Sequence, residues 1–279
     1  MFTKKRGIKK CTYYFKMEEQ LKTFVEKFKP SISIFTVCPT GSCPAEFTNS
    51  LVGTMQLCFQ YKIMIQVEFH KQYHTLVHAK NAFLSKCEQD KSITHVMFID
   101  SNVIWKPADI INMLLTDKQI IAGAVPQSYL WDSFDNGNLV EFIANKIKTE
   151  PMLKDIQMSS LVKSKMCRYN VQIPTNDIVI ENNLLEVLQV SFQFIMIHRN
   201  VLEKMVESFP SSKYTANNTT VYCLMENTVE EGVFYSDEEV FSKRWTNMDG
   251  KIHVSTNIIL ENISLSSCQG ELLRSLLLL

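Results

Sequence analysis

Apolar residues in the first half of the chain follow two alternating spacings. Where they recur every three or four positions, the pattern predicts helices at residues 18–29, 45–60, 75–90 and 106–117. Between these segments, short β-rich runs predict strands at residues 31–39, 61–69, 94–100 and 118–126. Strands that alternate with helices favour an α/β fold, in which a mostly parallel sheet carries helices on both faces. Such sheets bind ligands at the carboxyl ends of their strands.

The second half of the chain has a weaker pattern, and residues 127–185 predict few elements. Beyond them, the pattern predicts two strands within 184–199, a loop at 211–220 and a strand region at 251–260. Helices are predicted at 200–209, with Asn200 as N-cap, and at 236–250, with Ser236 as N-cap and Gly250 as the residue that ends it. Acidic residues in the first turn of the second helix favour this start through the helix dipole.

The composition is that of an ordinary globular chain and argues against two classes of protein. Apolar residues make up 46% and charged residues 21% of the 279 positions, which argues against intrinsic disorder. Lys and Arg together number 29, as do Asp and Glu, so the overall charge does not suggest binding to nucleic acid. The basic residues within 4–10 predict a solvated arm; a patch for an anionic membrane or nucleic acid is the alternative.

The cysteines and the lengths of the apolar runs bear on location. Eight cysteines stand at irregular spacings without a Cys-x-x-Cys pair. This pattern predicts a reduced, cytoplasmic protein, although an even number leaves disulfides open. No run of about 18 apolar residues occurs, and lysines interrupt the first apolar residues, so neither a membrane-spanning helix nor a signal peptide is predicted.

Candidate chemistry centres on the end of the predicted strand 94–100. Asp100, Ser101 and Asn102 follow four apolar residues there. Oxygen ligands at a strand end suit hard cations such as Mg²⁺ and Mn²⁺, which often bridge to substrate phosphates. An ordinary strand-to-turn junction is the alternative, because Asp, Ser and Asn are favoured in turns.

The neighbouring residues add a resemblance to a known family. The segment "THVMFIDSNVIWKPADIINMLL" followed by "IIAGAVPQ" resembles the core of GT-A-type glycosyltransferases, where a strand ends in a D-x-D motif. "TVCPTG" resembles the first-strand loop of that family, "HAKNAFL" resembles its "ARN" helix start, and "SDEEVFSKRWTNMDGKIHVSTNIILENIS" resembles its acidic segment. The similarity covers roughly residues 31–126 and 190–264 and is closest to a group found in bacteria and large DNA viruses. If the source is viral, we expect the protein in the host cytoplasm or the virion.

The resemblance implies a GT-A-like (nucleotide-diphospho-sugar transferase) fold with a mixed, mostly parallel sheet flanked by helices. It implies a single domain at 31–264, made of a nucleotide-binding half (31–126) and an acceptor-side half (127–264). Residues 1–30 would form a basic arm and helix, and residues 265–279 a C-terminal tail.

The resemblance also assigns roles to individual residues. The pocket for a UDP- or GDP-sugar would take in Pro39, Thr40, Lys80, Asn81, Asp100, Ser101 and Asn102, with Gly123 and Ala124 near the donor sugar. Mn²⁺ or Mg²⁺ would be held by Asp100, Asn102 and Asn262. Glu238 or Asp237 would be the catalytic base that takes the acceptor's proton. The predicted function is transfer of a sugar from a nucleotide donor to a glycan or protein acceptor.

This sequence departs from the family at the residues that matter most for catalysis. Asn102 stands where the second D-x-D carboxylate is expected, and Asn262 where the metal-binding histidine is expected. The acidic pair is reversed, and the bulky Phe192-Gln193 replaces a small-residue turn. These exchanges predict weakened metal dependence. They also motivate the alternative, a catalytically inactive glycosyltransferase-like binding or interaction protein.

Three further groups of side chains are candidates for chemistry. Lys80 and the pair Lys243-Arg244 could stabilise the charge of a diphosphate without metal; solvated helix faces are the alternative. The third group, His70, His74 and His78, is spaced by four and could bind a transition metal if it shared a helix face. Surface or loop histidines are the simpler interpretation. No Walker A loop, Rossmann glycine motif or nucleophile elbow occurs.

Overall fold

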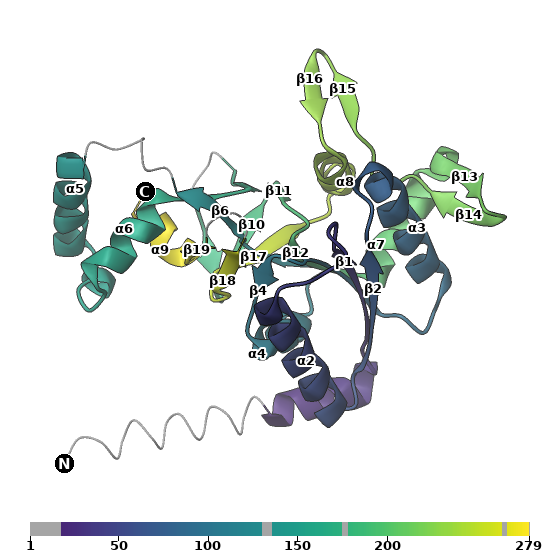
Figure 1. The fold of residues 1–279 in the computed structure, drawn as a ribbon, viewed down its shortest axis with the longest axis horizontal. Helices are drawn as coiled ribbons and strands as arrows, with labels where there is room; N and C mark the ends of the chain where they lie inside the picture. Colours follow the sequence, from purple (N-terminus) through teal and green to yellow (C-terminus); the bar gives the residue numbers. More distant parts are fainter. Residues whose placement is uncertain (1–17, 130–135, 175–177, 264–266, 279) are drawn as a thin grey trace.

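The computed structural model describes residues 18–129, 136–174, 178–263 and 267–278. At its centre lies an eight-stranded sheet with the order β2-β1-β3-β12-β5-β17-β10-β9 (Figure 1). The strands are β1 (Ser31–Val37), β2 (Met64–His70), β3 (His95–Asp100), β5 (Ile120–Gly123), β9 (Ile180–Glu181), β10 (Leu184–Val187), β12 (Phe194–His198) and β17 (Ile252–Ser255). The fold is therefore α/β, as the alternating pattern predicts.

The prediction of a mostly parallel sheet is wrong. β1 pairs in parallel with β2 and β3, and β5 with β17. The other four pairings, β3–β12, β12–β5, β17–β10 and β10–β9, are antiparallel. The helix-strand alternation fixes direction only where a crossover helix joins neighbouring strands. β12 instead arrives from the second half of the chain and enters between β3 and β5, and no local pattern encodes its direction.

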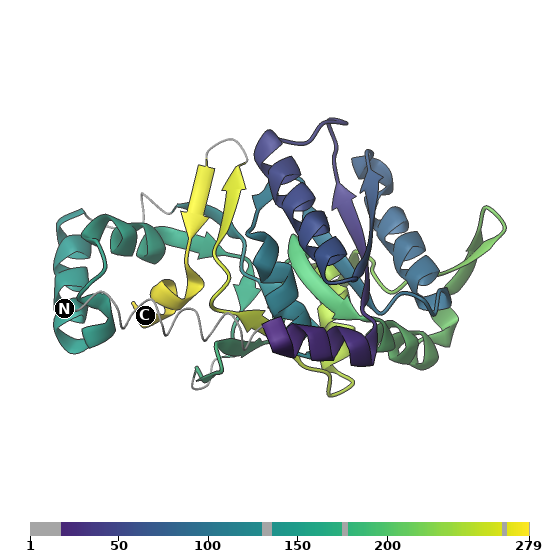
Figure 2. The same ribbon diagram turned by 90° about the horizontal axis from the view of Figure 1, so that it is seen from below.

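Helices cover both faces of the sheet. The helix at residues 18–28, α2 (Ala45–Gln60) and α4 (Pro107–Leu115) pack on one face. The other face carries α3 (Leu76–Gln89), α7 (Arg199–Ser208) and α8 (Asp237–Thr246). Figure 2 shows α2 and α4 on one side of the sheet and α3 on the other. Two hydrophobic clusters fill the space between helices and sheet, one on each face.

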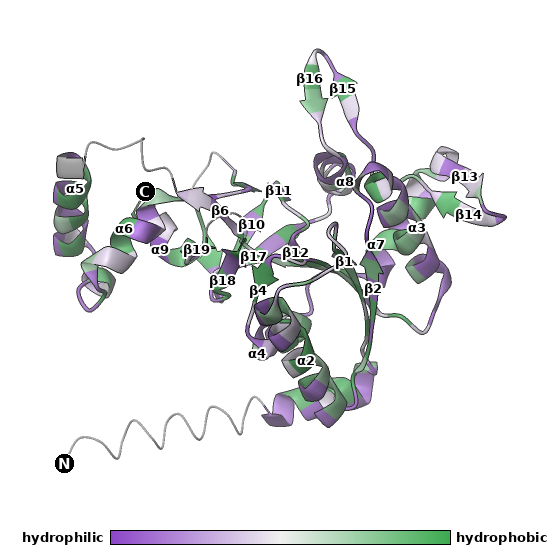
Figure 3. Cartoon of the chain, in the orientation of Figure 1, coloured by the Kyte–Doolittle hydropathy of each residue, from purple (hydrophilic) through white to green (hydrophobic). Residues whose placement is uncertain are grey.

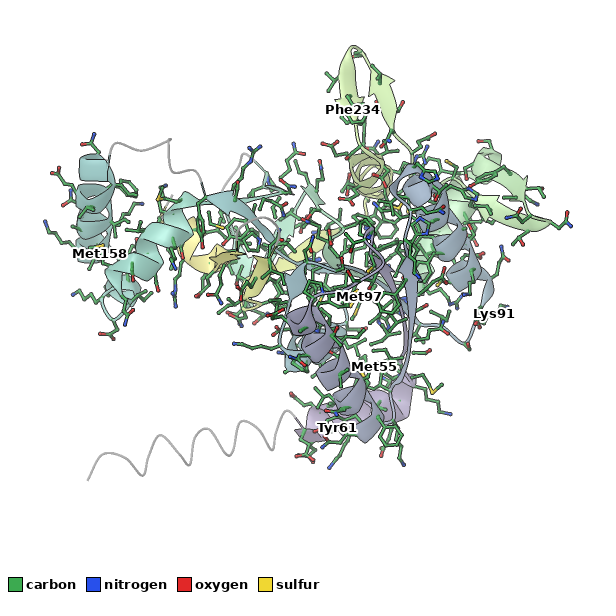
Figure 4. The ribbon with its side chains drawn as sticks, viewed as in Figure 1. Met55, Tyr61, Lys91, Met97, Met158 and Phe234 are labelled. Carbon is green, nitrogen blue, oxygen red and sulfur yellow. The ribbon has the colours of Figure 1, made fainter. Side chains whose placement is uncertain are left out.

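The central strands are buried because their sequences are continuously apolar. In β3 every residue except the terminal Asp100 is buried, and in β1 only the two end residues are partly exposed. Figure 3 shows hydrophobic residues concentrated in the strands at the centre of the sheet, and Figure 4 places Met97 of β3 within the packed side chains there. The edge strand β2 instead alternates between exposed and half-buried residues. β3 is therefore buried on both faces up to its last residue, Asp100, whose acidic side chain directly follows the apolar run.

Smaller elements extend this core. A second group of helices, α5 (Asn136–Thr149), η3 (Pro151–Leu153), α6 (Met158–Met166) and α9 (Leu272–Leu277), builds a third hydrophobic cluster to one side of the sheet. Short strands connect it to the centre: β4 (Val103–Ile104), β6 (Pro126–Tyr129), β7 (Cys167–Tyr169), β8 (Val171–Gln172), β11 (Gln189–Val190), β18 (Leu260–Ile263) and β19 (Ser267–Gly270). The division into halves at residue 126, with a tail from 265, stays a prediction. Among the described helices, none combines the length and apolar character needed to cross a membrane.

The segment 211–220, predicted as a loop, carries a short helix η4 (Pro210–Ser212) and a β-hairpin of β13 (Lys213–Ala216) and β14 (Thr219–Tyr222). Asn217 and Asn218 form its turn with φ of 48° and 60°. Two-residue hairpin turns of this kind need positive φ at both positions, which Asn tolerates. A second hairpin, β15 (Thr228–Glu230) and β16 (Val233–Tyr235), projects from the molecule and carries Phe234 (Figure 4).

Two helix boundaries differ from their predictions. The N-cap of α7 is His198, whose side chain accepts a hydrogen bond from the N–H of Asn200, so Asn200 is not the cap. Helix α8 begins after Ser236, as predicted, but ends at Thr246 and not at Gly250. A Cβ at Gly250 would lie 2.2 Å from Cε2 of Trp245. That glycine therefore allows close packing on the tryptophan ring.

Candidate functional site

Asp100 lies at the carboxyl end of β3, beside the end of β1. The two strands are parallel, and Val37 of β1 is the register partner of Asp100. Their common edge borders a cavity of about 80 Å³. Its polar lining comes from Lys80, Asp100, Gln193 and Glu238, and six apolar residues complete the wall. Strand ends and two helices far apart in sequence thus converge on one small cavity.

A buried cluster of charges joins α3 to α8 at this cavity. The Nζ of Lys80 donates hydrogen bonds to Oδ2 of Asp237 at 2.8 Å and to Oε1 of Glu238 at 2.9 Å. Burial by itself would lower the pKa of Lys80, but the charges of Glu238 and Asp237 and their hydrogen bonds outweigh it and raise the pKa. Lys80 therefore stays protonated inside the protein.

The first turn of α8 holds the two carboxylates in place. Ser236 and Glu239 form a reciprocal capping box, in which each side chain bonds the backbone N–H of the other. The backbone N–H of Asp237 donates to Oδ1 of Asn227 at 2.9 Å. Glu238 uses both oxygens, because Oε2 accepts the backbone N–H of Phe192 at 3.0 Å. Both carboxylate oxygens of Glu238, the predicted base, therefore already accept hydrogen bonds.

Asp100 is a partly buried carboxyl group near these charges. Burial raises its pKa, and hydrogen bonds from the Asn102 backbone and the Gln193 side chain oppose the rise. Its Oδ1 accepts the Asn102 N–H at 3.2 Å. With Asp100 ionised, three carboxylates and one ammonium leave a formal charge of −2 around the cavity. This net charge opposes the entry of a diphosphate, and Lys80 is the cation of the cavity lining that would attract it.

Phe192 keeps the cavity small. Only 4% of its surface is exposed, and its ring lies 5.5 Å from that of Phe98 and 5.2 Å from that of Phe241, centroid to centroid. Pockets that hold nucleotide-sized ligands measure about 300–1,000 Å³. A cavity of about 80 Å³ cannot hold a nucleotide in this conformation. Entry of one requires side chains of the lining to move, and Phe192 is one of them.

A larger groove lies on the other side of Glu238. It measures about 440 Å³, and its lining includes residues 168–172, Gln189, Ser191, Ser236, Glu238 and Glu239. Most of these side chains are polar hydrogen-bonding groups. Glu238 therefore lies in the wall between this groove and the Asp100 cavity. Sequence reasoning missed the groove, because residues 127–185 show no periodic pattern and the lining residues come from short strands.

Several residues predicted for the nucleotide pocket are used elsewhere. The Asn81 amide accepts the N–H groups of Leu224 and Met225 and donates to the Met225 carbonyl, so it fixes a backbone segment. A Cβ on Gly123 would lie 2.9 Å from Leu260 and 3.0 Å from Phe194, and Ala124 is buried in the cluster that contains Phe192. These three residues do not line the cavity.

Three further residues of this set, Pro39, Thr40 and Ser101, follow the ends of β1 and β3 and do not line the cavity. Pro39 and Thr40 lie in the loop after β1, where Pro39 is partly exposed and Thr40 is exposed. Ser101 is buried, and its N–H donates to the Val37 carbonyl at 3.4 Å. The structure thus brings Lys80, Asp100 and Glu238 together at one cavity.

The predicted metal ligands form a poor donor set for Mg²⁺ or Mn²⁺. Asn262 pairs with Val103 across β4 and β18, which places it next to the turn at residues 101–102. It is 5% exposed, and its amide donates to the Pro126 carbonyl at 3.1 Å. One carboxylate and two amides supply a single negative charge, whereas hard cations favour several charged oxygens. Among the described residues, no group of three or more His, Cys, Asp or Glu side chains could hold a metal ion.

The other candidate cations and histidines have structural partners. Lys243 pairs with Glu230 and lies over the ring of Tyr235, and Arg244 pairs with Glu226. Both anchor the segment before α8 and do not line the cavity. His70, His74 and His78 lie on β2, on η1 (Tyr73–Thr75) and on α3 respectively, not on one helix face. His78 Nδ1 is 2.8 Å from the hydroxyl of Tyr214, which lies in the β13–β14 hairpin.

Comparisons with known proteins give little further identification. No protein-family model matches the chain, and no curated protein matches it. Among solved structures, the chain is similar to the crystal structure of A197 from STIV, with 11% sequence identity and a TM-score of 0.41. That alignment covers 84% of this chain and 86% of A197. The functional proposal therefore depends on the geometry of the site.

Proposed function

We propose that this chain is a GT-A-like glycosyltransferase that binds a UDP- or GDP-sugar at the Asp100 cavity and transfers the sugar to a glycan or protein acceptor. One observation carries the proposal. Glu238 lies between the cavity at the ends of β1 and β3 and the polar groove of about 440 Å³. A donor in the first and an acceptor in the second would meet at this carboxylate.

Glu238 and Lys80 would have different roles in the reaction. In an inverting transfer, an acceptor hydroxyl in the groove attacks the anomeric carbon, and the bond from that carbon to the diphosphate oxygen breaks. Glu238 takes the proton of the hydroxyl as general base. Lys80 lines the cavity and would stabilise the negative charge that develops on the diphosphate. Its long side chain ends at Glu238, so a diphosphate that attracts Lys80 would also release the base.

This chemistry requires the closed site to open. Phe192 must leave its position between Phe98 and Phe241, and its N–H must release Oε2 of Glu238. Binding energy from the nucleotide would offset the lost packing. Binding of Mn²⁺ or Mg²⁺ together with the diphosphate stays a prediction, and none of the steps described here requires the metal ion.

The experiment is an assay of nucleoside diphosphate release. The full chain is incubated with UDP- and GDP-sugars, with and without Mn²⁺, and with a panel of oligosaccharide acceptors. We expect release from at least one donor, and loss of release in the isosteric variant Glu238→Gln. The matched control is Glu203→Gln, which changes a partly exposed acid on α7 that lines neither the cavity nor the groove. Release that survives Glu238→Gln contradicts the assigned base.

A second candidate is a binding or interaction protein with the same fold and no turnover. The specific observation in its favour is that Lys80 and the Phe192 backbone occupy both oxygens of Glu238. In that case nucleotide binding would occur without release for every donor and acceptor. The release assay, together with a binding titration, separates the two candidates.

A further inference from the structure

The loop after β1 brings two thiols into contact. Cys38 is buried and directly follows β1, and Cys43 stands five residues later, just before α2. Their Sγ atoms lie 3.1 Å apart. A disulfide needs about 2.05 Å, so the two sulfurs are about 1 Å from bonding distance. The irregular cysteine spacing of the sequence gave no sign of this pair.

Hydrogen bonds within the loop hold the thiols in this position. The N–H of Cys38 donates to the His70 carbonyl at 2.7 Å, which fixes one end to β2. Gly41 has a φ of +74°, a conformation that glycine adopts readily, and its N–H donates to the Cys38 carbonyl at 3.0 Å. The Cys38 thiol and the Thr40 hydroxyl both donate to the Ser42 carbonyl. The turn therefore brings residues 41–43 back to Cys38.

Accessibility distinguishes this pair from the cysteines of the core. Cys43 is partly exposed, so a small oxidant in solution can reach it. Cys58 and Cys87 are fully buried in hydrophobic clusters on opposite faces of the sheet. They provide internal controls for any reaction of exposed thiols.

We propose that Cys38 and Cys43 are a redox-active dithiol that forms an intrachain disulfide on reaction with a small-molecule disulfide such as glutathione disulfide. The Cys43 thiolate attacks one sulfur of the oxidant, and the departing glutathione thiolate takes up the Cys43 proton. The Cys38 thiolate then attacks Sγ of Cys43 and displaces the second glutathione, which takes up the Cys38 proton. The protein dithiol loses two electrons, and the oxidant is reduced to two glutathione thiols.

The local environment sets the rate of this reaction and its consequence. Burial, and then the hydrogen bond with Cys38, raise the pKa of Cys43 to about 12, so little thiolate forms at neutral pH and oxidation accelerates as pH rises. Once formed, the bond removes the thiol donor from the Ser42 carbonyl and closes a ring that contains Pro39 and Thr40. This inference does not rest on the proposed function. If that function is right, oxidation would also alter the loop predicted to hold the nucleotide.

Thiol trapping and mass spectrometry test the dithiol. The full chain is equilibrated in mixtures of reduced and oxidised glutathione, quenched in acid, unfolded and alkylated with N-ethylmaleimide. In oxidising mixtures we expect the peptide with Cys38 and Cys43 to carry no N-ethylmaleimide label. Its mass should be two hydrogen atoms below that of the unlabelled dithiol peptide. Cys58 and Cys87 should keep their labels. The conversion should be faster at higher pH.

Variants provide the matched controls. In Cys43→Ser, Cys38 should remain alkylatable, whereas Cys87→Ser should form the same disulfide as the unaltered chain. The proposal is overturned if both thiols stay labelled in the oxidising mixtures, if Cys43 stops at a glutathione adduct, or if either residue pairs with another cysteine. The result on the unaltered chain decides the matter even if a variant fails to fold. Failure here would leave the glycosyltransferase proposal untouched.

Discussion

Nζ of Lys80 lies 2.9 Å from Oε1 of Glu238, a residue 158 positions later in the chain. The contact joins α3 to α8 across the Asp100 cavity, and the same carboxylate borders the polar groove behind it. A nucleotide diphosphate that enters the cavity must compete with Glu238 and Asp237 for the ammonium group. In the proposed reaction, this ion pair would therefore affect the stability of the protein, the entry of the ligand and the release of the base.

Removal of Lys80 should destabilise the protein strongly. In Lys80→Met, Asp237 and Glu238 would keep their charges without the buried cation that neutralises them. Loss of one partner of a buried ion pair costs about 3–5 kcal/mol of unfolding free energy. Urea unfolding measures this loss, and the double variant Lys80→Met/Glu238→Gln should recover part of it. A loss below about 1 kcal/mol, typical of exposed pairs, would contradict the buried ion pair.

Truncation of Phe192 should open the cavity. Phe192→Ala removes a ring packed between Phe98 and Phe241, and a large-to-small change of this kind costs about 3–5 kcal/mol. We nevertheless expect tighter binding of UDP or GDP, because the space that the nucleotide needs no longer has to be cleared. Phe47→Ala, on the opposite face of the sheet, is the matched control. It should lose similar stability without any gain in affinity, and equal affinities in the two variants would contradict the role of Phe192.

A second carboxylate at position 102 should strengthen metal binding. Asn102 is partly exposed beside Asp100, whose Oδ1 it bonds through its backbone N–H. In Asn102→Asp the two acids would offer a pair of charged oxygens, and we expect Mn²⁺ affinity to rise by about tenfold. Titration with Mn²⁺, followed by electron paramagnetic resonance, measures this change. Asn257→Asp adds the same charge at an exposed site elsewhere and should leave the affinity unchanged.

Acid should destabilise the protein through His95. Burial, and then the nearby His198, lower the pKa of His95 to about 3 from its ordinary value of 6.5. The unfolded chain binds this proton near pH 6.5 and the folded chain only near pH 3, so stability falls as pH drops between these values. The expected loss from this residue is about 2 kcal/mol at pH 5.

Thermal and urea unfolding as a function of pH measure this loss. His95→Asn keeps a polar group able to bond the Thr94 hydroxyl, which lies 2.8 Å from Nδ1 of His95. That variant should show a smaller decrease in stability between neutral pH and pH 5. An unchanged decrease would show that other groups cause the acid sensitivity.

The parts of the structure that depend on local sequence could be predicted. The apolar run of β3 and the acidic residue after it predicted that Asp100 lies at the end of a buried strand, and the structure places it there, beside a cavity. The Ser236 start of α8 followed from capping preferences alone. Both features depend on interactions between residues close in the chain.

The parts that depend on distant contacts could not be predicted. The antiparallel entry of β12 and the packing of Phe192 on Phe241 join segments whose relation no local pattern encodes. For the same reason the sequence showed Asn81 as a polar helix residue and not as a clamp on the 224–225 backbone. Lys80 and Glu238 were predicted for one site because of a family resemblance, and their direct ion pair was not foreseen.

Isothermal titration calorimetry of UDP and GDP, on the unaltered chain and on Glu238→Gln, tests the central claim most directly. The variant lowers the negative charge around the cavity and frees Lys80 from one of its two carboxylates. We predict saturable binding of one nucleotide at a single site, with affinity about tenfold higher in Glu238→Gln because the diphosphate then competes less for the ammonium group. No binding to either protein, or weaker binding to Glu238→Gln, would contradict a diphosphate site at Lys80 and Asp100.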